Sequence, residues 1–336
     1  MKAIIPVAGI GSRLRPHTHT QPKALVPVAG KPIIAHIIDT LIAHGVEDLI
    51  FITGYLRGKI ESFITANYSD YNVKFILQEP REGVGHAIWM AREEITPEEH
   101  VVLWLGDTIL NLDFAALFSN ENNVIGIKKV DNPLAFGVAE IDRSGMVKRV
   151  IEKPRIPKSN QAIVGIYKIA NTQLLIKCLQ IIVEQDLRTH NEIQLTDALM
   201  LMIEEGARFS TLTVDNWYDC GKKESLLEAN SILLSQQRSQ FNAAQYAGSI
   251  IIPPVKLGKG CNIAHSIIGP NVAIGDATNI SHSIIQDSII GSYSELNNTV
   301  LKASVIGNDT TLSGLTQSLN VGDNTEINFN NALQRD

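Results

Sequence analysis

The sequence predicts an α/β region followed by a β-solenoid, because its two parts follow different patterns. Up to about residue 235, short apolar runs rich in β-branched residues alternate with helical patterns, which is typical of an α/β fold with a mainly parallel sheet. From about residue 250, aromatic residues nearly disappear and a short aliphatic unit recurs at a fixed period. We therefore expect one domain over 1–235, a linker over 236–249 and a second domain over 250–336.

The first region contains six apolar runs that we expect to form strands. They span Ala3–Val7, Leu49–Thr53, Val73–Leu77, Val101–Leu105, Val124–Ile127 and Ile163–Ile169. Among the helical patterns, Pro32–His44 has apolar residues at a 3.6-residue period and is followed by Gly45 as a stop. Lys222–Ser235 is predicted to be the last helix, and the Gln-, Ser- and Ala-rich segment after it to be the linker.

The second region repeats a unit of one aliphatic residue, Gly, four residues and another aliphatic residue. The units are Leu257–Ile263, Ile274–Ile280, Ile290–Leu296, Ile306–Leu312 and Val321–Ile327. Their starts lie 17, 16, 16 and 15 residues apart. A period of this kind predicts stacked coils whose aliphatic residues form one continuous core, here a β-solenoid of about five coils.

The charge is distributed unevenly along the chain. The net charge of −6 argues against nucleic-acid binding, which normally needs a basic face. The first 38 residues nevertheless contain no Asp or Glu but five basic residues, which are Lys2, Arg13, Arg15, Lys23 and Lys31. We therefore expect an anion site near the N-terminus, with phosphates as its ligand.

Composition and cysteine usage indicate a globular cytoplasmic protein. With 44% hydrophobic and 19% charged residues the chain is neither disordered nor fibrous, and its apolar runs are far shorter than the roughly 18 to 20 residues of a membrane span. The first residues do not resemble a signal peptide. Cys178, Cys220 and Cys261 are widely spaced, so we expect reduced thiols without a disulfide framework or a zinc site.

A glycine-containing run follows the first predicted strand. Gly9 and Gly11 let backbone N–H groups approach phosphate oxygens, and Arg13 and Lys23 supply positive charge nearby. The run is not a dinucleotide fingerprint, which would need a third glycine where Leu14 stands, and the sequence contains no Gly-Lys followed by Ser or Thr as in a P-loop. A phosphate loop of a third kind and a plain tight turn both explain these glycines.

The run Ala8–Pro16 with Pro22-Lys23 resembles the signature of sugar-1-phosphate nucleotidylyltransferases. Further segments match in the family's order: Gln78-Glu79, Leu105-Gly106-Asp107, Phe136-Gly137-Val138, Glu152-Lys153-Pro154, Gly165-Ile166-Tyr167, Glu192–Asp197 and Trp217–Gly221. The resemblance covers residues 1 to about 235 and is closest to the long-form glucose-1-phosphate thymidylyltransferases with a C-terminal β-helix. It implies a Rossmann-like, mixed but mainly parallel sheet in a nucleotidyltransferase domain, followed by a left-handed parallel β-helix of hexapeptide repeats.

The resemblance also implies a reaction. The enzyme would transfer a nucleotidyl group from a pyrimidine nucleoside triphosphate, dTTP favoured, to a hexose 1-phosphate, glucose 1-phosphate favoured, and release pyrophosphate. Since no bond to the enzyme forms, positioning and charge neutralisation would carry the catalysis. Arg13 would hold the triphosphate and the leaving pyrophosphate, Lys23 the α-phosphate, and Lys153 the sugar phosphate. Asp107 and Asp219 would hold Mg²⁺, which prefers oxygen ligands and bridging phosphates.

The remaining expected site residues bind the base and the sugar. The nucleotide-binding set is Gly9, Gly11, Gln78 and Gly83, and the sugar-binding set is Gly137, Glu152, Gly165 and Glu192. The Gln78 amide both donates and accepts hydrogen bonds, as a pyrimidine edge requires. Ala24 and Thr108 depart from the pattern of the short thymidylyltransferases, so the resemblance leaves the identity of the base and the sugar open.

Three alternatives remain beside this prediction. The first is a uridylyltransferase using UTP, because the 5-methyl group of thymine is a small apolar contact. The second is a bifunctional enzyme with an acyltransferase tail, for which His265 and His282, one coil apart, are the candidates, although surface imidazoles explain them better. The third is a non-catalytic sugar-nucleotide sensor or scaffold. In each case we expect a homo-oligomer, since low-charge coils offer stacking surfaces.

Overall fold

The computed structural model describes residues 1–97, 99–237, 241–242, 245–246, 248–314 and 319–328. Contacts divide the chain into two compact units, one formed by Met1–Gly9 and His36–Trp217, the other by Ile10–Ala35 and the chain from Tyr218 onward. The predicted linker 236–249 and the end of the predicted second domain lie partly outside the described residues. The domain boundaries expected at 235 and 250 stay a prediction, and we refer to Ile10–Ala35 as the N-terminal segment.

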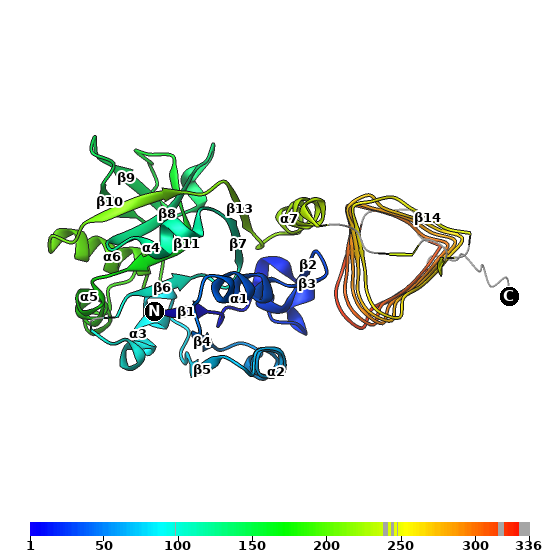
Figure 1. The fold of residues 1–336 in the computed structure, drawn as a ribbon, viewed down its shortest axis with the longest axis horizontal. Helices are drawn as coiled ribbons and strands as arrows, with labels where there is room; N and C mark the ends of the chain where they lie inside the picture. Colours follow the sequence, from blue (N-terminus) through cyan, green and yellow to red (C-terminus); the bar gives the residue numbers. More distant parts are fainter. Residues whose placement is uncertain (98, 238–240, 243–244, 247, 315–318, 329–336) are drawn as a thin grey trace. The chain divides into compact units, whose positions relative to one another are not determined.

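A nine-stranded mixed sheet forms the centre of the first unit (Figure 1). Its strands are β1 (Lys2–Pro6), β4 (Asp48–Thr53), β5 (Asn72–Leu77), β6 (Val101–Trp104), β8 (Asn123–Lys129), β9 (Val138–Ile141), β10 (Val147–Ile151), β11 (Gln161–Ile169) and β12 (Phe209–Thr213). The main path is β10-β9-β11-β6-β1-β4-β5, with β8 beside β11 and β12 beside β8. Parallel pairs join β1 to β4 and β6, β4 to β5, and β8 to β12.

The expected α/β fold with a mixed, mainly parallel sheet is confirmed. All six predicted strands are present, each with ends within two residues of the prediction. Ile4 of β1 and Val102 of β6 are completely buried, which explains why these strands appear in the sequence as continuous apolar runs. The antiparallel strand β11, which pairs with β6, β8 and β9, makes the sheet mixed.

The described residues also form seven α-helices, the last of which belongs to the second unit. They are α1 (Ile33–Ala43), α2 (Arg57–Asn67), α3 (Val84–Met90), α4 (Phe114–Ser119), α5 (Thr172–Glu184), α6 (Leu195–Glu204) and α7 (Lys223–Gln236). The predicted helices Pro32–His44 and Lys222–Ser235 correspond to α1 and α7 and are confirmed. α3, α5 and α6 pack on the sheet through Ile88, Leu179 and Leu199, which share one buried core with Leu103 of β6.

Short elements connect these larger ones. They are η1 (Ser12–Leu14), η2 (His17–His19), η3 (Lys23–Leu25), β2 (Pro27–Val28), β3 (Lys31–Pro32), η4 (Arg92–Glu94), β7 (Thr108–Asn111), η5 (Pro133–Ala135) and β13 (Asn216–Asp219). Three single turns of 3₁₀ helix and the antiparallel β2–β3 pair lie within the N-terminal segment. This segment therefore follows β1 as an ordered stretch of tight turns.

The repeats of the second region fold into three parallel sheets, seen along the coil axis in Figure 1. The first contains β14 (Ile250–Ile251), β17 (Ile267–Ile268), β20 (Ile284–Gln286) and β23 (Val300–Lys302). The second contains β15 (Val255–Leu257), β18 (Val272–Ile274), β21 (Ile289–Ile290), β24 (Val305–Ile306) and β26 (Asn320–Val321). The third contains β16 (Asn262–Ala264), β19 (Asn279–Ser281), β22 (Glu295–Asn297), β25 (Thr311–Ser313) and β27 (Glu326–Asn328). The expected left-handed parallel β-helix is confirmed.

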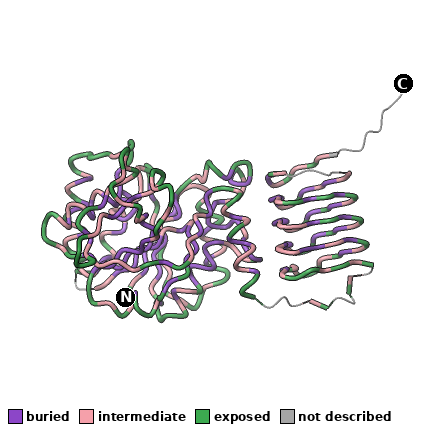
Figure 2. The backbone as a smooth tube through the Cα atoms, turned by 90° about the horizontal axis from the view of Figure 1, so that it is seen from above, coloured by how far each residue is buried: buried purple, intermediate pink, exposed green. Residues whose placement is uncertain are grey.

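The β-helix is held by an aliphatic core and by its glycines. Figure 2 shows the coils stacked, with buried stretches repeating at the same place in each. Ile263, Ile280, Leu296 and Leu312 form one buried column of the core. A Cβ at Gly275 would lie 2.5 Å from the backbone N of the next coil, so only glycine allows the coils to approach this closely.

Two further expectations concern the whole chain. Within the described residues no helix is long and apolar enough to cross a bilayer. Cys178 and Cys220 are buried and Cys261 is partly buried, and none of the three forms a disulfide bond within the described part of the chain.

Candidate active site

The expected phosphate loop lies directly after β1. Gly11 has a φ of 68°, and a Cβ there would lie 3.0 Å from side-chain atoms of both Lys23 and Thr18. Thr18 Oγ1 donates a hydrogen bond of 2.9 Å to the Gly11 carbonyl, and the amide of Leu14 donates to the same oxygen. A Cβ at Gly9, by contrast, would meet no heavy atom within 4 Å. Gly11 is therefore required by the turn itself, whereas the space beside Gly9 is open to a ligand.

Two cations of the N-terminal segment face one carboxylate. Lys23 Nζ lies 3.6 Å from Asp219 Oδ1, and Arg13 Nη1 lies 3.7 Å from Asp219 Oδ2. Lys23 is buried in η3, and Arg13 is exposed in η1. The Asp219 carbonyl accepts hydrogen bonds from Gly221 N at 2.7 Å and Ser225 Oγ at 2.5 Å, which fixes the turn between β13 and α7. Three of the expected residues thus form one cluster of charges.

Asp107 lies at the carboxyl end of β6, in the first unit. A Cβ at the preceding Gly106 would lie 2.3 Å from Val7, so glycine is needed where the ends of β1 and β6 approach. The buried Thr108 closes the turn, because its Oγ1 donates to the Leu105 carbonyl at 2.9 Å. Asp107 is therefore held on a rigid turn at the sheet edge where open α/β sheets bind their ligands. Asp219 belongs to the second unit.

The expected base-binding residues meet at the end of β5. The buried Gln78 donates from Nε2 to the Gly83 carbonyl at 2.9 Å, and the same atom lies 3.3 Å from His86 Nδ1. Gly83 has a φ of 110°, and a Cβ there would lie 2.6 Å from the Ile193 carbonyl oxygen. Burial lowers the pKa of His86, which favours the neutral ring that accepts from Gln78. His86 is a member of this cluster that the sequence analysis missed.

Two of the expected sugar-binding residues, Gly137 and Glu152, also lie together. A Cβ at Gly137 would lie 3.0 Å from Glu152 Oε2, so the glycine leaves room for this carboxylate. Thr196 Oγ1 donates to Glu152 Oε2 at 3.3 Å, and Lys153 Nζ lies 3.6 Å from Glu152 Oε1. Thr196 was not singled out, although it belongs to the matched segment Glu192–Asp197.

Gly165 and Glu192 have different surroundings. Gly165 is buried in β11 with a φ of 86°, and a Cβ there would lie 2.8 Å from Leu105. Its carbonyl accepts a hydrogen bond from the Leu105 amide at 2.8 Å. Gly165 therefore lies beside the end of β6, the strand that precedes Asp107. Glu192 is exposed and accepts from Gln194 Nε2 at 3.0 Å. A Cβ at Gly83 would lie 2.9 Å from Glu192 Cβ, so Glu192 borders the base-binding cluster.

The carboxylates do not by themselves form a complete metal cage. Among the described residues no group of three or more His, Cys, Asp and Glu side chains could hold a metal ion. Mg²⁺ differs from zinc in this respect, because it keeps several waters and uses one or two carboxylates together with substrate phosphates. A carboxylate such as that of Asp107 or that of Asp219 supplies oxygen donors of the kind that Mg²⁺ prefers.

A glycine-containing turn with two cations that face one carboxylate is an arrangement typical of polyanion-binding proteins. The chain matches the family "Nucleotidyl transferase" over residues 2–236 and belongs to that family. It is 34% identical over 246 residues to a low-salt glycan biosynthesis nucleotidyltransferase, Agl11, of Haloferax volcanii, covering 70% of this chain and 67% of the relative.

Two further proteins are similar to this chain. The bifunctional protein GlmU of Methanococcus vannielii is 34% identical over 263 residues, which cover 75% of this chain and 61% of the relative, so this chain spans about three fifths of it. A crystal structure of a putative glucose-1-phosphate thymidylyltransferase from Bacillus anthracis in complex with a sucrose superposes with a TM-score of 0.60. It is 29% identical and covers 69% of this chain and 94% of that protein.

Proposed function

We propose that this protein transfers a nucleotidyl group from a pyrimidine nucleoside triphosphate to a hexose 1-phosphate, with dTTP and glucose 1-phosphate as the favoured pair. The observation that carries the proposal is the cluster in which Arg13 and Lys23 face Asp219 beside Gly11. A polyphosphate needs cations and backbone N–H groups at one place, and this cluster supplies both. The similar thymidylyltransferase from Bacillus anthracis supports the choice of substrates.

In the proposed reaction an oxygen of the sugar phosphate attacks the α-phosphorus in line. The new oxygen–phosphorus bond forms as the bond to the bridging oxygen of the β-phosphate breaks, and pyrophosphate leaves with that electron pair. Arg13 binds the triphosphate and the departing pyrophosphate, Lys23 neutralises charge at the α-phosphate, and Lys153 holds the sugar phosphate. The protein accelerates the step by positioning both polyanions and offsetting their repulsion.

Asp107 and Asp219 are proposed to hold the Mg²⁺ ion. When bound, Mg²⁺ supplies additional positive charge to the phosphates. Arg13 and Lys23 lie within 4 Å of the Asp219 carboxylate, so phosphates bound there would also face both cations. The carboxylate thus keeps two cations in place before substrate arrives.

The base and the sugar are proposed to bind at the two clusters of the first unit. Gln78, with Gly83, reads the pyrimidine edge, and the open space beside Gly9 together with the turn at Gly11 admits the phosphates. The sugar hydroxyls are bound by the set Gly137, Glu152, Gly165 and Glu192. The contact of Glu152 with Thr196 and Lys153 orients its carboxylate for this role. We also propose that the protein works in the cytoplasm, where nucleoside triphosphates are available.

UTP is the first alternative nucleotide, because a methyl contact discriminates by only about 1–3 kcal/mol. Pyrophosphate release with Mg²⁺ decides the question when dTTP, UTP, CTP, ATP and GTP are each paired with the 1-phosphates of glucose, galactose, mannose and N-acetylglucosamine. An optimum at dTTP or UTP with one sugar is expected. No release from any pair by folded, nucleotide-binding protein would refute the enzyme and favour a non-catalytic sensor or scaffold.

A second activity in the β-helix is favoured by one observation. His265 and His282 are exposed at the same corner of adjacent coils, and their rings stack with centroids 5.2 Å apart. The similar Methanococcus vannielii protein is named bifunctional. Turnover of a CoA ester that is lost in His265→Gln or His282→Gln would establish an acyltransferase tail. Turnover that is absent from the unmodified protein would exclude it for the esters used.

The β-helix is also proposed to join copies of the chain. Ile250, Ile267, Ile284 and Val300 stand in register on the first sheet, and three of them are exposed large apolar residues: Ile250, Ile284 and Val300. An apolar stripe of this kind is usually covered in solution. Light scattering should give a mass above one chain, and Ile284→Glu should lower it. A monomer at micromolar concentration would contradict the proposal.

A further inference from the structure

The N-terminal segment and the β-helix belong to the same compact unit. The last described coil contacts this segment at three residues. Thr20 Oγ1 donates a hydrogen bond to Asp323 Oδ2, and His17 Nε2 forms a hydrogen bond with Asn320 Oδ1. A Cβ at Gly322 would lie 3.1 Å from Pro16, which shows how closely the two backbones approach. All of these contacts lie in the few residues that follow Arg13.

Asp323 is held by the stack of coils and uses its second oxygen for the contact. Its Oδ1 accepts from the Asn308 amide of the preceding coil at 2.8 Å. The same position in earlier coils repeats this bond, since Ser292 N donates to Asn308 Oδ1 at 2.8 Å and Lys259 N donates to Asp276 Oδ1 at 2.7 Å. Among the described coils, the side chain at this position also accepts a hydrogen bond from the N-terminal segment in the last one, where it is Asp323.

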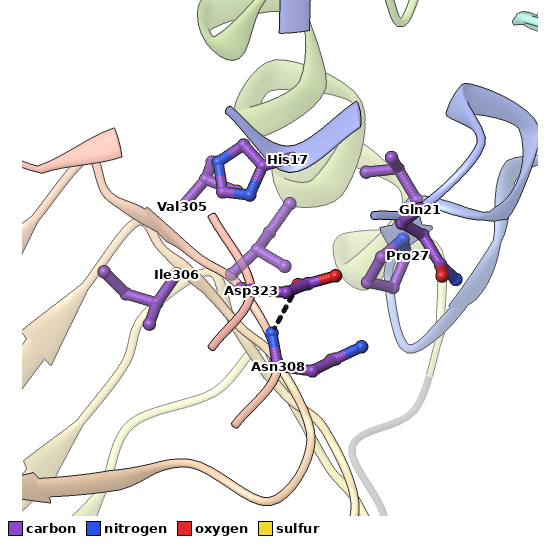
Figure 3. A pocket seen from close by; sticks show the side chains of 11 residues that line it. His17, Gln21, Pro27, Val305, Ile306, Asn308 and Asp323 are labelled. Carbon is purple, nitrogen blue, oxygen red and sulfur yellow. Dashed lines mark hydrogen bonds between the residues drawn. The ribbon is translucent and has the colours of Figure 1, made fainter. Parts of the chain in front are cut away.

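Figure 3 shows a small pocket beside this contact, with the hydrogen bond between Asn308 and Asp323 drawn as a dashed line. His17, Gln21 and Pro27 of the N-terminal segment line one side, and residues of the β-helix, Val305 and Ile306 among them, line the other. His17 is buried, and this burial lowers the pKa of its ring. The contact is thus a packed interface within the unit.

A second attachment lies further along the segment. Asn230 of α7 is completely buried and accepts from the Ala29 amide at 2.9 Å, while its Nδ2 donates to the Asn271 carbonyl of the β-helix at 3.1 Å. A Cβ at Gly30 would lie 2.4 Å from the Lys256 side chain. The segment is therefore attached to the β-helix at residues 16–20 and near residues 29–30, and Lys23 lies between the two attachments.

The first attachment continues to the phosphate loop. His17 and Thr20 flank Thr18, whose hydroxyl donates to the Gly11 carbonyl at 2.9 Å. Arg13 lies two residues after Gly11 and faces Asp219. The contact of Thr20 with the last described coil is therefore connected, through Thr18 and Gly11, to Arg13.

We propose that Asn320 and Asp323 are positioning residues, through which the last coil holds the phosphate loop in the geometry that binds a nucleoside triphosphate. The inference rests on the proposed function for the identity of the ligand. Ordering a glycine-containing loop before the substrate arrives removes part of the entropy cost of binding it. The β-helix would thus contribute to nucleotide binding without touching the nucleotide.

The test compares Asp323→Ala and Thr20→Val with Asp276→Ala in the full chain. Asp276→Ala is the matched control, because it removes the same bond between coils but no contact with the N-terminal segment. Hydrogen exchange of peptides covering residues 10–22 should accelerate about 10-fold in Asp323→Ala and Thr20→Val and stay unchanged in the control. Exchange that is equal in Asp323→Ala and Asp276→Ala would overturn the proposal.

The kinetic readout separates positioning from mere stability. In Asp323→Ala the KM for the nucleoside triphosphate should rise about 10-fold, with the KM for the sugar phosphate changed by less than about 2-fold. Asp323→Asn keeps the acceptor for Asn308 and a polar group toward Thr20, and it should restore both exchange and KM to within about 3-fold of the unmodified protein. Accelerated exchange with an unchanged KM would refute the positioning role. If the unmodified protein releases no pyrophosphate, the proposed function fails, and exchange with and without nucleotide still decides whether the last coil orders the loop.

Discussion

Lys23 Nζ lies 3.6 Å from Asp219 Oδ1. The two residues come from opposite ends of the catalytic region in the sequence, one from η3 and the other from the end of β13. A buried ammonium group needs a partner, and the same carboxylate also faces Arg13. The pair therefore brings both cations of the N-terminal segment to one carboxylate.

Replacement of either proposed metal ligand should stop the reaction without unfolding the protein. Asp219→Asn and Asp107→Asn keep the side-chain volume but remove the negative charge, so we expect pyrophosphate release to fall at least about 100-fold at saturating Mg²⁺. Asp131→Asn, which changes an exposed carboxylate after β8, is the control and should keep the normal rate. Circular dichroism checks the fold, and a variant with near-normal rate would remove that residue from the metal site.

Lys153 is predicted to act on the sugar phosphate. Lys153→Ala should raise the KM for hexose 1-phosphate by about 10-fold or more and leave the KM for the nucleotide nearly unchanged, because a charge-assisted contact to one substrate is lost. Lys158→Ala removes an exposed lysine of the same loop and should change neither constant. Initial rates at varied sugar phosphate measure the effect. An unchanged dependence on sugar phosphate in Lys153→Ala would refute the assignment.

Gln78 is predicted to determine the choice of base. Gln78→Leu has a similar volume but loses the hydrogen bond to Gly83, and we expect the preference for dTTP or UTP over ATP in kcat/KM to fall by about 10- to 100-fold. Gln173→Leu, at an exposed position of α5, serves as the control. Competition between a pyrimidine and a purine triphosphate measures the ratio. If Gln78→Leu kept the normal ratio, the base would bind elsewhere.

The stability of the protein should depend on pH through His17. Burial lowers the pKa of this ring from the ordinary 6.5, and the hydrogen bond to Asn320 and the charge of Asp323 oppose the effect only in part. Below pH 6.5 the unfolded chain therefore binds a proton that the folded protein does not, and the free energy of unfolding falls as the pH falls, by at most about 1.4 kcal/mol per pH unit for this group.

Urea unfolding between pH 7.5 and 5.5 checks this dependence. In His17→Gln the free energy of unfolding should decrease less steeply below pH 6.5 than in the unmodified protein. His190→Gln, which removes an exposed imidazole, should show the same pH dependence as the unmodified protein. If the free energy of unfolding had the same pH dependence in His17→Gln and in the unmodified protein, His17 would not contribute to that dependence. Both variants should be compared with the unmodified protein at each pH, since truncation of a buried ring also lowers stability at every pH.

Local patterns in the sequence predicted the larger elements well. The strands β1 and β6 are mostly apolar because both of their faces are buried, and α1 shows the helical period because Ile34, Ile38 and Leu41 of one face are buried. The repeats predicted the second and third sheets of the β-helix, since each repeat begins in one and ends in the other. These features depend on residues close in the sequence, so spacing alone indicates them.

Contacts between distant segments were not predictable in the same way. Thr196 reaches Glu152, 44 residues away, because α6 packs beside β10. Even His86, eight residues after Gln78, approaches it through the course of the intervening loop and not through a helical or strand period. No periodicity encodes either pair. The placement of the N-terminal segment with the β-helix was likewise unexpected, since the resemblance ended at about residue 235.

The sequence by itself determined that the chain has an α/β region with a glycine-containing turn after its first strand and a β-helix of about five coils, because periodicity, glycine spacing and repeat length are local properties. Only the tertiary structure decided that Arg13 and Lys23 share Asp219, and that Thr20 binds Asp323. Such pairs form when chain segments hundreds of residues apart pack together, and their contacts depend on distances in space that sequence spacing does not record.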